Sequence, residues 1–252
     1  MIDRRGMTAA LVALAVGAAG VAMAAVPANI TAALADKARP AADTARDAAR
    51  KPGELLAFAE VKPGQKVADF MMGSGYFTRI LAPAVGPAGK VYAYQSAEFV
   101  KFRAAYGTEQ QAAVADYKNV TPLTAPLSAV GLPEGLDLVL TVQNYHDLHL
   151  PAFPADTADS VNRQVFKALK PGGLYVVVDH AAAAGAPEAE TANKLHRIDE
   201  ANVKKEVEAA GFKLVSEDRM LASPADDHSL NVFQPAIRGK TDQFVLKFRK
   251  PK

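Results

Sequence analysis

The chain contains no cysteine and no tryptophan among its 252 residues. Without cysteine there can be no disulfide, no thiolate metal site and no cysteine nucleophile. An excess of charge of one sign is also missing, since 29 Lys and Arg face 27 Asp and Glu, for a net charge of +2. Proteins that bind nucleic acid usually carry a strongly basic face or tail, so we expect no nucleic-acid partner. The composition is 50% hydrophobic and 22% charged, which is typical of a globular protein, and it sets no oligomeric state.

Residues 1–24 have the pattern of a cleaved signal peptide. Arg4 and Arg5 precede an uncharged run of Ala, Val, Leu and Gly from 9 to 25, and Ala22-Met23-Ala24 has the small-x-small pattern of a cleavage site. The run is shorter than the roughly 20 residues that span a bilayer, although an uncleaved membrane anchor is the alternative. The arginine pair loosely resembles a twin-arginine export signal. We expect a periplasmic or otherwise exported protein that meets the membrane only through this signal.

The remaining chain divides into an Ala-rich helical arm over 25–50 and an α/β domain over 51–252. Strands are expected at 66–71, 90–95, 118–123, 136–142, 174–180, 212–220 and 243–249. Helices are expected at 53–60, 76–85, 97–116, 157–170 and 199–210. This alternation predicts a Rossmann-like, mostly parallel sheet of seven strands with helices on both faces. The last strand follows its predecessor without a helix, so we expect it to run antiparallel.

The connection over 221–242 is unusually long for a compact domain, which is typical of a lid or a binding loop. It leaves the predicted sheet at the edge where ligands bind in such folds. Asp226-Asp227-His228 within it either closes over a substrate or forms a solvated acidic turn. In the preceding helical stretch, Phe99, Phe102 and Tyr106 recur at helical spacing, which predicts a core position for all three.

A glycine-rich turn ends the first predicted strand and opens a helix. In the run from Val67 to Thr78, Asp69 comes at the end of the strand and is followed by Gly73 and Gly75. Glycines at this place let the backbone pass close to a nucleotide-like ligand. The amide groups at the start of the helix can donate hydrogen bonds to it.

The chain resembles the class I S-adenosylmethionine-dependent methyltransferases over most of residues 50–250. The motifs that carry the resemblance are Lys62-Pro63-Gly64, the glycine turn, Val85 to Val91, Leu169 to Gly173 and Val207 to Val215. The run Asn144-Tyr145-His146-Asp147, the segment His196 to Asp199 and the ending Arg238 to Phe244 are similar to a bacterial subgroup of predicted exported methyltransferases. The resemblance implies S-adenosylmethionine as the cofactor.

The resemblance also implies which residues hold that cofactor. They are Asp69, Gly73, Gly75, Tyr76, Gln95 and Gln143. Met71 stands where the family has its first glycine. Gln95 stands where the family has the acid that binds both ribose hydroxyls, with Glu98 as a possible substitute, and Thr124 stands near the third acidic position. An amide can accept one hydrogen bond and donate another, without the strength of a carboxylate.

Polar residues collect after the fourth predicted strand, where a methyl acceptor lies in this fold. We expect His146 to act as a general base or to orient the acceptor, with Asn144, Tyr145 and Asp147 positioning it or the substrate. A histidine held by a carboxylate suits this role because it titrates near neutral pH. The alternative is that Asn144 and Asp147 cap the following turn and that His146 is a satisfied polar group.

Other polar residues are expected to be structural. We expect His149 and His196 to be satisfied polar groups, and Arg197 and Asp199 to pair or to cap the following helix. Nitrogen and oxygen donors that could gather a divalent ion are His146, Asp147, His149, Asp179 and His180. Catechol-type methyltransferases place several carboxylates around a hard metal ion. These five residues do not have that spacing, so no metal is expected.

Two classes of function follow. The first is methyl transfer from S-adenosylmethionine to a small-molecule acceptor. The second is an exported ligand-binding or accessory protein that keeps the scaffold and has lost methyl transfer. The second is motivated by an export signal on a protein whose cofactor is made in the cytosol, and by Met71, Gln95 and Thr124 at family positions. Fold alone does not decide between them.

Overall fold

A single seven-stranded sheet forms the centre of the protein. The computed structural model describes residues 25–252, so the predicted signal peptide over 1–24 lies outside the described residues. The strands are β1 (Lys66–Phe70), β2 (Lys90–Ser96), β3 (Val120–Ala125), β4 (Leu136–Val142), β5 (Leu169–His180), β6 (Lys213–Asp218) and β7 (Gln243–Arg249). They are ordered β3-β2-β1-β4-β5-β7-β6. β7 runs antiparallel to both of its neighbours, β5 and β6, and the other strand pairs are parallel, which confirms the predicted fold class.

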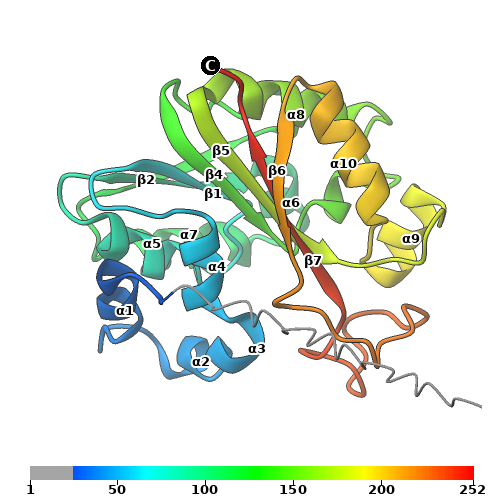
Figure 1. The fold of residues 1–252 in the computed structure, drawn as a ribbon, viewed down its shortest axis with the longest axis horizontal. Coiled ribbons are helices and arrows are strands. Elements are labelled where there is room, and N and C mark those ends of the chain that lie inside the picture. Colours follow the sequence, from blue (N-terminus) through cyan, green and yellow to red (C-terminus); the bar gives the residue numbers. More distant parts are fainter. Residues whose placement is uncertain (1–24) are drawn as a thin grey trace, which may run out of the picture.

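Helices cover both faces of this sheet, with α1, α5 and α7 on one side and α8 and α10 on the other (Figure 1). The helices are α1 (Ala28–Leu34), α2 (Ala41–Thr44), α3 (Asp47–Arg50), α4 (Pro52–Phe58), α5 (Thr78–Val85), α6 (Ala97–Phe102), α7 (Ala105–Val114), α8 (Thr157–Ala168), α9 (Glu188–Leu195) and α10 (Glu200–Ala209). Two short 3₁₀ turns, η1 (Leu127–Ala129) and η2 (His146–His149), follow β3 and β4.

The core consists of two apolar clusters, one on each face of the sheet. Successive strand residues point to opposite faces, so Val67 and Leu138 belong to the cluster under α5, whereas Ala68 and Val139 belong to the cluster under α8. Because both faces are covered, the central strands read as nearly continuous apolar runs. The strand order reverses between β1 and β4, and in open α/β sheets the ligand-binding crevice lies at such a switch point.

The stretch predicted as one helix over 97–116 is two helices, α6 and α7. Arg103 after α6 has an extended backbone with φ −139°, which ends the helix and changes the helical phase. The prediction of a core position for Phe102 is therefore wrong, since this side chain is 86% exposed. Phe99 and Tyr106 are half-buried and meet edge to face, with ring centroids 6.4 Å apart. Helix α9 had no counterpart among the predicted elements.

The arm before α4 packs against the domain. Asn29 at the start of α1 donates its side-chain amide to the carbonyls of Val61 and Ala84, at 3.3 and 3.0 Å. Further along, α2 and α3 bring polar side chains over the glycine turn, where Asp47 accepts a hydrogen bond from the hydroxyl of Tyr76 at 2.6 Å. Within residues 25–252, every helix is too short or too polar to cross a membrane.

Candidate functional site

The turn after β1 keeps a glycine-type backbone although one glycine is replaced. Met71 has φ 56°, Gly73 φ 57° and Gly75 φ 86°, all in the left-handed region. This conformation costs a residue with a Cβ atom roughly 1–2 kcal/mol. The side chain of Met71 is only 3% exposed and packs in the apolar cluster on the α8 side of the sheet. The path of the turn is thus retained, with a buried methionine in it.

Gly73 and Gly75 in this turn differ in what a Cβ atom would contact at each position. A Cβ atom added to Gly73 would meet nothing within 4 Å, so this residue borders open space. A Cβ atom on Gly75 would lie 2.3 Å from the Cβ atom of Ala113 in α7. Gly75 therefore permits close packing of α7, which is a structural requirement in addition to its predicted cofactor role.

Two buried polar side chains support the turn. Asp69, at the end of β1, accepts a hydrogen bond from the Thr78 hydroxyl at 2.6 Å, and burial raises its pKa to about 6. Gln95, at the end of β2, accepts a hydrogen bond from the backbone N–H of Gly73 at 3.1 Å. The side-chain oxygen of Gln95 therefore already holds the turn, and its contact with a ribose stays a prediction.

The two other predicted cofactor positions have partners within the protein. Glu98 accepts hydrogen bonds from the Ser96 hydroxyl at 2.7 Å and from the backbone N–H of Leu127 at 3.1 Å. The hydroxyl of Thr124 donates to Gln110 at 2.8 Å. These two side chains therefore hold the segments after β2 and β3 in place.

Arg50, at the end of α3, is a residue that sequence reasoning missed. Its guanidinium stacks over the rings of Tyr76 and Phe77, 4.5 and 5.0 Å from their centroids. Its Nε is buried without a hydrogen-bond partner, and among residues 25–252 no carboxylate forms an ion pair with it, whereas Arg46 pairs with Asp43. Burial lowers the pKa of Arg50 to about 10, so the side chain stays cationic at neutral pH. No motif marks this residue in the sequence, because only folding of the arm brings it to the turn.

The residues after β4 link this strand to the glycine turn and to β7. Gln143 has φ 64° and donates its amide to Gln243 at 3.0 Å. The amide of Asn144 is oriented so that its oxygen and its nitrogen both have suitable hydrogen-bond partners. In this orientation the nitrogen donates to the carbonyls of Val142 at 2.6 Å and Met71 at 3.2 Å. Asn144 therefore joins the two predicted halves of the site, the cofactor turn and the acceptor side.

Tyr145 lies on the inner side of this segment. It is 1% exposed, its hydroxyl donates to Glu206 at 2.8 Å, and Asn162 donates to that hydroxyl at 2.7 Å. Its ring and hydroxyl are held by α8 and α10, so its role is to fix the position of η2. Because η2 carries His146, this agrees with Tyr145 helping to position His146, and a contact of Tyr145 with a substrate stays a prediction.

His146 is held by Asp179, the penultimate residue of β5. One carboxylate oxygen of Asp179 lies 2.8 Å from His146 Nδ1, and the other accepts the backbone N–H of His146 at 2.7 Å. Both side chains are buried, and His146 Nε2 lies 3.3 Å from the carboxylate of Asp147. Burial opposes the charged imidazolium, but the carboxylates of Asp179 and Asp147 outweigh burial and raise the pKa of His146 to about 9. This value is above the near-neutral titration expected from the sequence, because two carboxylates face the ring.

Two further histidine rings gather around His146. His180 lies 6.3 Å from it between ring centroids, and its Nδ1 forms a hydrogen bond with the Thr241 hydroxyl at 2.8 Å. Burial lowers the pKa of His180 to about 3, so this ring is neutral. His196, at the end of α9, meets His146 edge to face at 5.4 Å. The expectation that His196 is only a satisfied polar group missed this contact, since nothing in the sequence relates the end of α9 to η2.

Two groups of three donor side chains, among the residues that the structure describes, lie close enough together to hold a metal ion. The first is His146, Asp147 and His196, and the second is His149, Glu188 and Glu206. The five donors named from the sequence thus do not form one group. Asp179 and His180 are instead hydrogen-bonded to His146 and Thr241.

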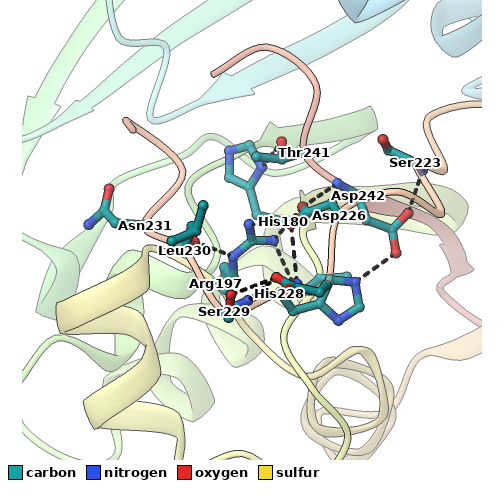
Figure 2. A network of polar contacts seen from close by, with 12 residues as sticks. His180, Arg197, Ser223, Asp226, His228, Ser229, Leu230, Asn231, Thr241 and Asp242 are labelled. Carbon is teal, nitrogen blue, oxygen red and sulfur yellow. Dashed lines mark hydrogen bonds and ion pairs between the residues drawn. The ribbon is translucent and has the colours of Figure 1, made fainter. Parts of the chain in front are cut away.

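The long connection after β6 is fastened to the domain by a buried ion pair, and its role as a lid or a binding loop stays a prediction. Arg197 contacts Asp226 through two hydrogen bonds of 2.9 Å, with side chains 0% and 2% exposed (Figure 2). Asp226 is therefore not part of a solvated turn. Of the two roles expected for Arg197 and Asp199, pairing or capping, capping is confirmed for Asp199, which accepts the N–H of Ala201 at the start of α10 at 3.0 Å. Arg197 pairs with Asp226 instead of Asp199.

The same network reaches the histidine cluster. Asp226 accepts the backbone N–H of Asp242 at 2.7 Å, and Asp242 lies 3.0 Å from His228 Nε2. Thr241, which precedes Asp242 in the chain, is the residue that contacts His180 (Figure 2). The Arg197–Asp226 pair thus fixes the segment that orients one ring of the candidate site.

Comparison with known proteins finds methyltransferases among those similar to this chain. No protein-family model matches the chain. A protein-L-isoaspartate O-methyltransferase from Aeropyrum pernix is 30% identical over 125 residues, which cover 50% of this chain and 42% of that protein. An S-adenosylmethionine-dependent methyltransferase structure from Aquifex aeolicus has a TM-score of 0.55 at 19% identity, covering 81% of this chain and 97% of that chain.

A second solved structure bears on the cofactor. Fibrillarin from Aeropyrum pernix, with natively bound S-adenosyl-L-methionine, has a TM-score of 0.52 at 16% identity, covering 81% of this chain and 76% of that chain. The chain therefore has the class I methyltransferase fold, with the strand order and the antiparallel β7 described above. S-adenosylmethionine is the cofactor of methyltransferases similar to it.

Proposed function

We propose that this chain transfers a methyl group from S-adenosylmethionine to a small-molecule acceptor bound beside His146. One observation carries the proposal. Asn144 joins the glycine turn, through the carbonyl of Met71, to the segment in which Asp179 holds His146. The cofactor turn and a carboxylate-held histidine thus meet at the switch point of the sheet, where ligands bind in this type of fold.

The residues around the turn fit the proposed cofactor. When bound, S-adenosylmethionine supplies an electrophilic methyl group on a sulfonium. Gly73 borders open space, and Arg50 offers a half-buried guanidinium whose buried Nε lacks a hydrogen-bond partner. A carboxylate is the anion that a guanidinium recognises best, so Arg50 is the candidate partner of the amino-acid end of the cofactor. Asp69 supplies an acidic group at the end of β1.

His146 is the candidate general base. Asp179 binds Nδ1 of His146 and fixes the orientation of the ring. Nε2, which lies 3.3 Å from the Asp147 carboxylate, is the nitrogen that takes the proton from the acceptor. The ring is 3% exposed, so bulk water has little access to it. His180, neutral because burial lowers its pKa to about 3, adds no competing positive charge.

Binding of the demethylated product S-adenosylhomocysteine tests the cofactor assignment. We expect saturable binding in calorimetry, and Arg50→Met is expected to weaken it about 10- to 100-fold, because a hydrogen bond between charged groups contributes about 1.5–3 kcal/mol. Arg46→Met is the matched control, since Arg46 also stacks on Tyr76 but pairs with Asp43. Absence of any binding to the folded protein would favour the alternative, a ligand-binding or accessory protein on this scaffold.

The pH dependence tests the role of His146. The titratable groups that face its ring are Asp179 with the neighbouring His180, Asp147 and His196. A base must be deprotonated, and the pKa of His146 is raised to about 9, so kcat/KM rises with pH up to about 9 and is constant above it. Asp147→Asn removes one of the carboxylates that raise this pKa, so the profile moves to lower pH. A profile that is flat between pH 7 and 9 in both proteins contradicts the assignment.

We also propose that the protein acts after export, on the evidence of residues 1–24. Fractionation of cells that express the whole chain, followed by mass determination of the exported form, tests this location.

A further inference from the structure

Three donor side chains from separate elements converge at the end of η2. His149 ends η2, Glu188 begins α9 and Glu206 lies in α10. One donor atom from each residue lies within 4.8 Å of the other two. Helix packing alone does not require this convergence of one imidazole and two carboxylates.

One ring nitrogen of His149 is buried and has no hydrogen-bond partner. The side chain is 7% exposed, and its Nε2 is buried without a hydrogen-bond partner. Nε2 lies 3.2 Å from a carboxylate oxygen of Glu206, without the alignment of a hydrogen bond. Nδ1, on the other side of the ring, lies 3.4 Å from Glu188. Burial of a polar atom without a hydrogen-bond partner destabilises a folded protein by about 1–3 kcal/mol. We therefore expect a ligand at this nitrogen.

We propose that His149, Glu188 and Glu206 bind one divalent transition-metal ion, with one imidazole nitrogen of His149 and one oxygen of each carboxylate as ligands and water completing the coordination. Zn²⁺ and Mn²⁺ accept imidazole together with carboxylates, whereas Mg²⁺ and Ca²⁺ prefer oxygen ligands alone. At metal–ligand distances of about 2.1 Å, tetrahedral donors lie about 3.4 Å apart, close to the 3.2 Å between His149 and Glu206.

The surroundings of the three ligands match those of a metal site. Tyr145 donates its hydroxyl to Glu206 at 2.8 Å, and Asn162 donates to that hydroxyl at 2.7 Å. Hydrogen bonds of this kind orient carboxylate ligands in metal proteins. Glu188 is 41% exposed and Glu206 16% exposed, so an ion can reach the site from solvent. Bound there, the ion ties α9 and α10 to η2, which has His146 at its other end.

The other donor group consists of His146, Asp147 and His196 and is not proposed as the metal site. His146 already holds Asp179 through Nδ1 and belongs to the site of the proposed reaction. The two groups are separate, so a metal titration of ligand variants distinguishes them.

Calorimetric titration of the chelator-treated protein with Zn²⁺ and with Mn²⁺, together with metal analysis after dialysis, tests the proposal. We expect one equivalent to bind, and His149→Gln and Glu206→Gln each to weaken binding about 100-fold or more. The amide oxygen introduced by Glu206→Gln can still accept the hydrogen bond from Tyr145, so this variant keeps the fold. Glu200→Gln, on the same helix but paired with Lys204 and Arg219, is the matched control and is expected to bind as the parent does.

Two outcomes overturn the proposal. One is the absence of stoichiometric binding by the folded parent protein. The other is binding that survives in His149→Gln but is lost in His196→Gln, which assigns the ion to the other donor group. The absorption spectrum of the Co²⁺ form reports the ligand set directly. These measurements use no methyl donor, so their result is independent of the proposed methyl transfer.

Discussion

Replacement of His146 by alanine is expected to lower kcat for methyl transfer about 10²- to 10⁴-fold, the usual contribution of a general base. Affinity for S-adenosylhomocysteine is expected to stay within a factor of about two, since His146 lies on the acceptor side. The assay follows methyl label from S-adenosylmethionine into the small-molecule fraction of a bacterial extract. The loss is expected because Asp179 holds Nδ1 of the ring and Nε2 is the proton acceptor.

A second variant separates catalysis from folding. His146→Gln keeps a side chain that can donate to Asp179, yet it cannot take up a proton. Asp179 also retains the backbone N–H groups of residues 146 and 180, both at 2.7 Å, so the carboxylate is not left without partners. We therefore expect the glutamine variant to be folded by circular dichroism and as inactive as the alanine variant. A glutamine variant with parental kcat would exclude His146 as the base.

Arg197→Met is expected to lower the free energy of unfolding by about 3–5 kcal/mol, measured by urea denaturation. The change leaves Asp226 as a buried charge without its partner, and breaking one side of a buried ion pair has this cost. Burial opposes the charged carboxylate, but the guanidinium of Arg197 holds the pKa of Asp226 below its ordinary value. Arg197 also donates to the carbonyls of Leu230 and Ala181, each at 3.0 Å, so the segment after β6 loses several contacts at once.

An exposed arginine that also pairs with a carboxylate is the matched control. Arg219 pairs with Glu200 but is 60% exposed, and Arg219→Met is expected to cost at most about 1 kcal/mol. The double replacement Arg197→Met with Asp226→Leu removes both charges and is expected to regain most of the lost stability, because apolar residues can replace a buried pair. Equal losses in Arg197→Met and Arg219→Met would show that burial of the pair is not what stabilises this segment.

Much of the sheet could be predicted from local pattern. The bounds of β4 and β7 agree with the predicted 136–142 and 243–249, because buried strands are short apolar runs between turn residues. The helix predicted over 97–116 failed at Arg103, since an amphipathic pattern does not report a break of one residue. Helix α9 was missed because its residues are mostly polar and only two of them, Thr191 and Ala192, are buried.

The candidate site was predictable only in part. His146 could be chosen from its place after a strand, since the carboxyl ends of parallel strands meet at one edge of the sheet. Asp179, His196 and Arg50 could be assigned only once the chain was folded, since they come from β5, the end of α9 and the end of α3. The carboxylates that face His146 also raise its pKa to about 9. This value could not be predicted from the positions of these residues in the sequence.

The amino-acid sequence by itself determined the class of fold, the glycine turn after β1 and the candidacy of His146, because each depends on residues close together in the chain. Only the tertiary structure decided that Asp226 pairs with Arg197, that Gln95 holds Gly73 and that His149 meets Glu188 and Glu206. These contacts join residues between 22 and 57 positions apart. Burial and the geometry of packing decide which residues make these contacts, and neither can be predicted from residues that are close together in the chain.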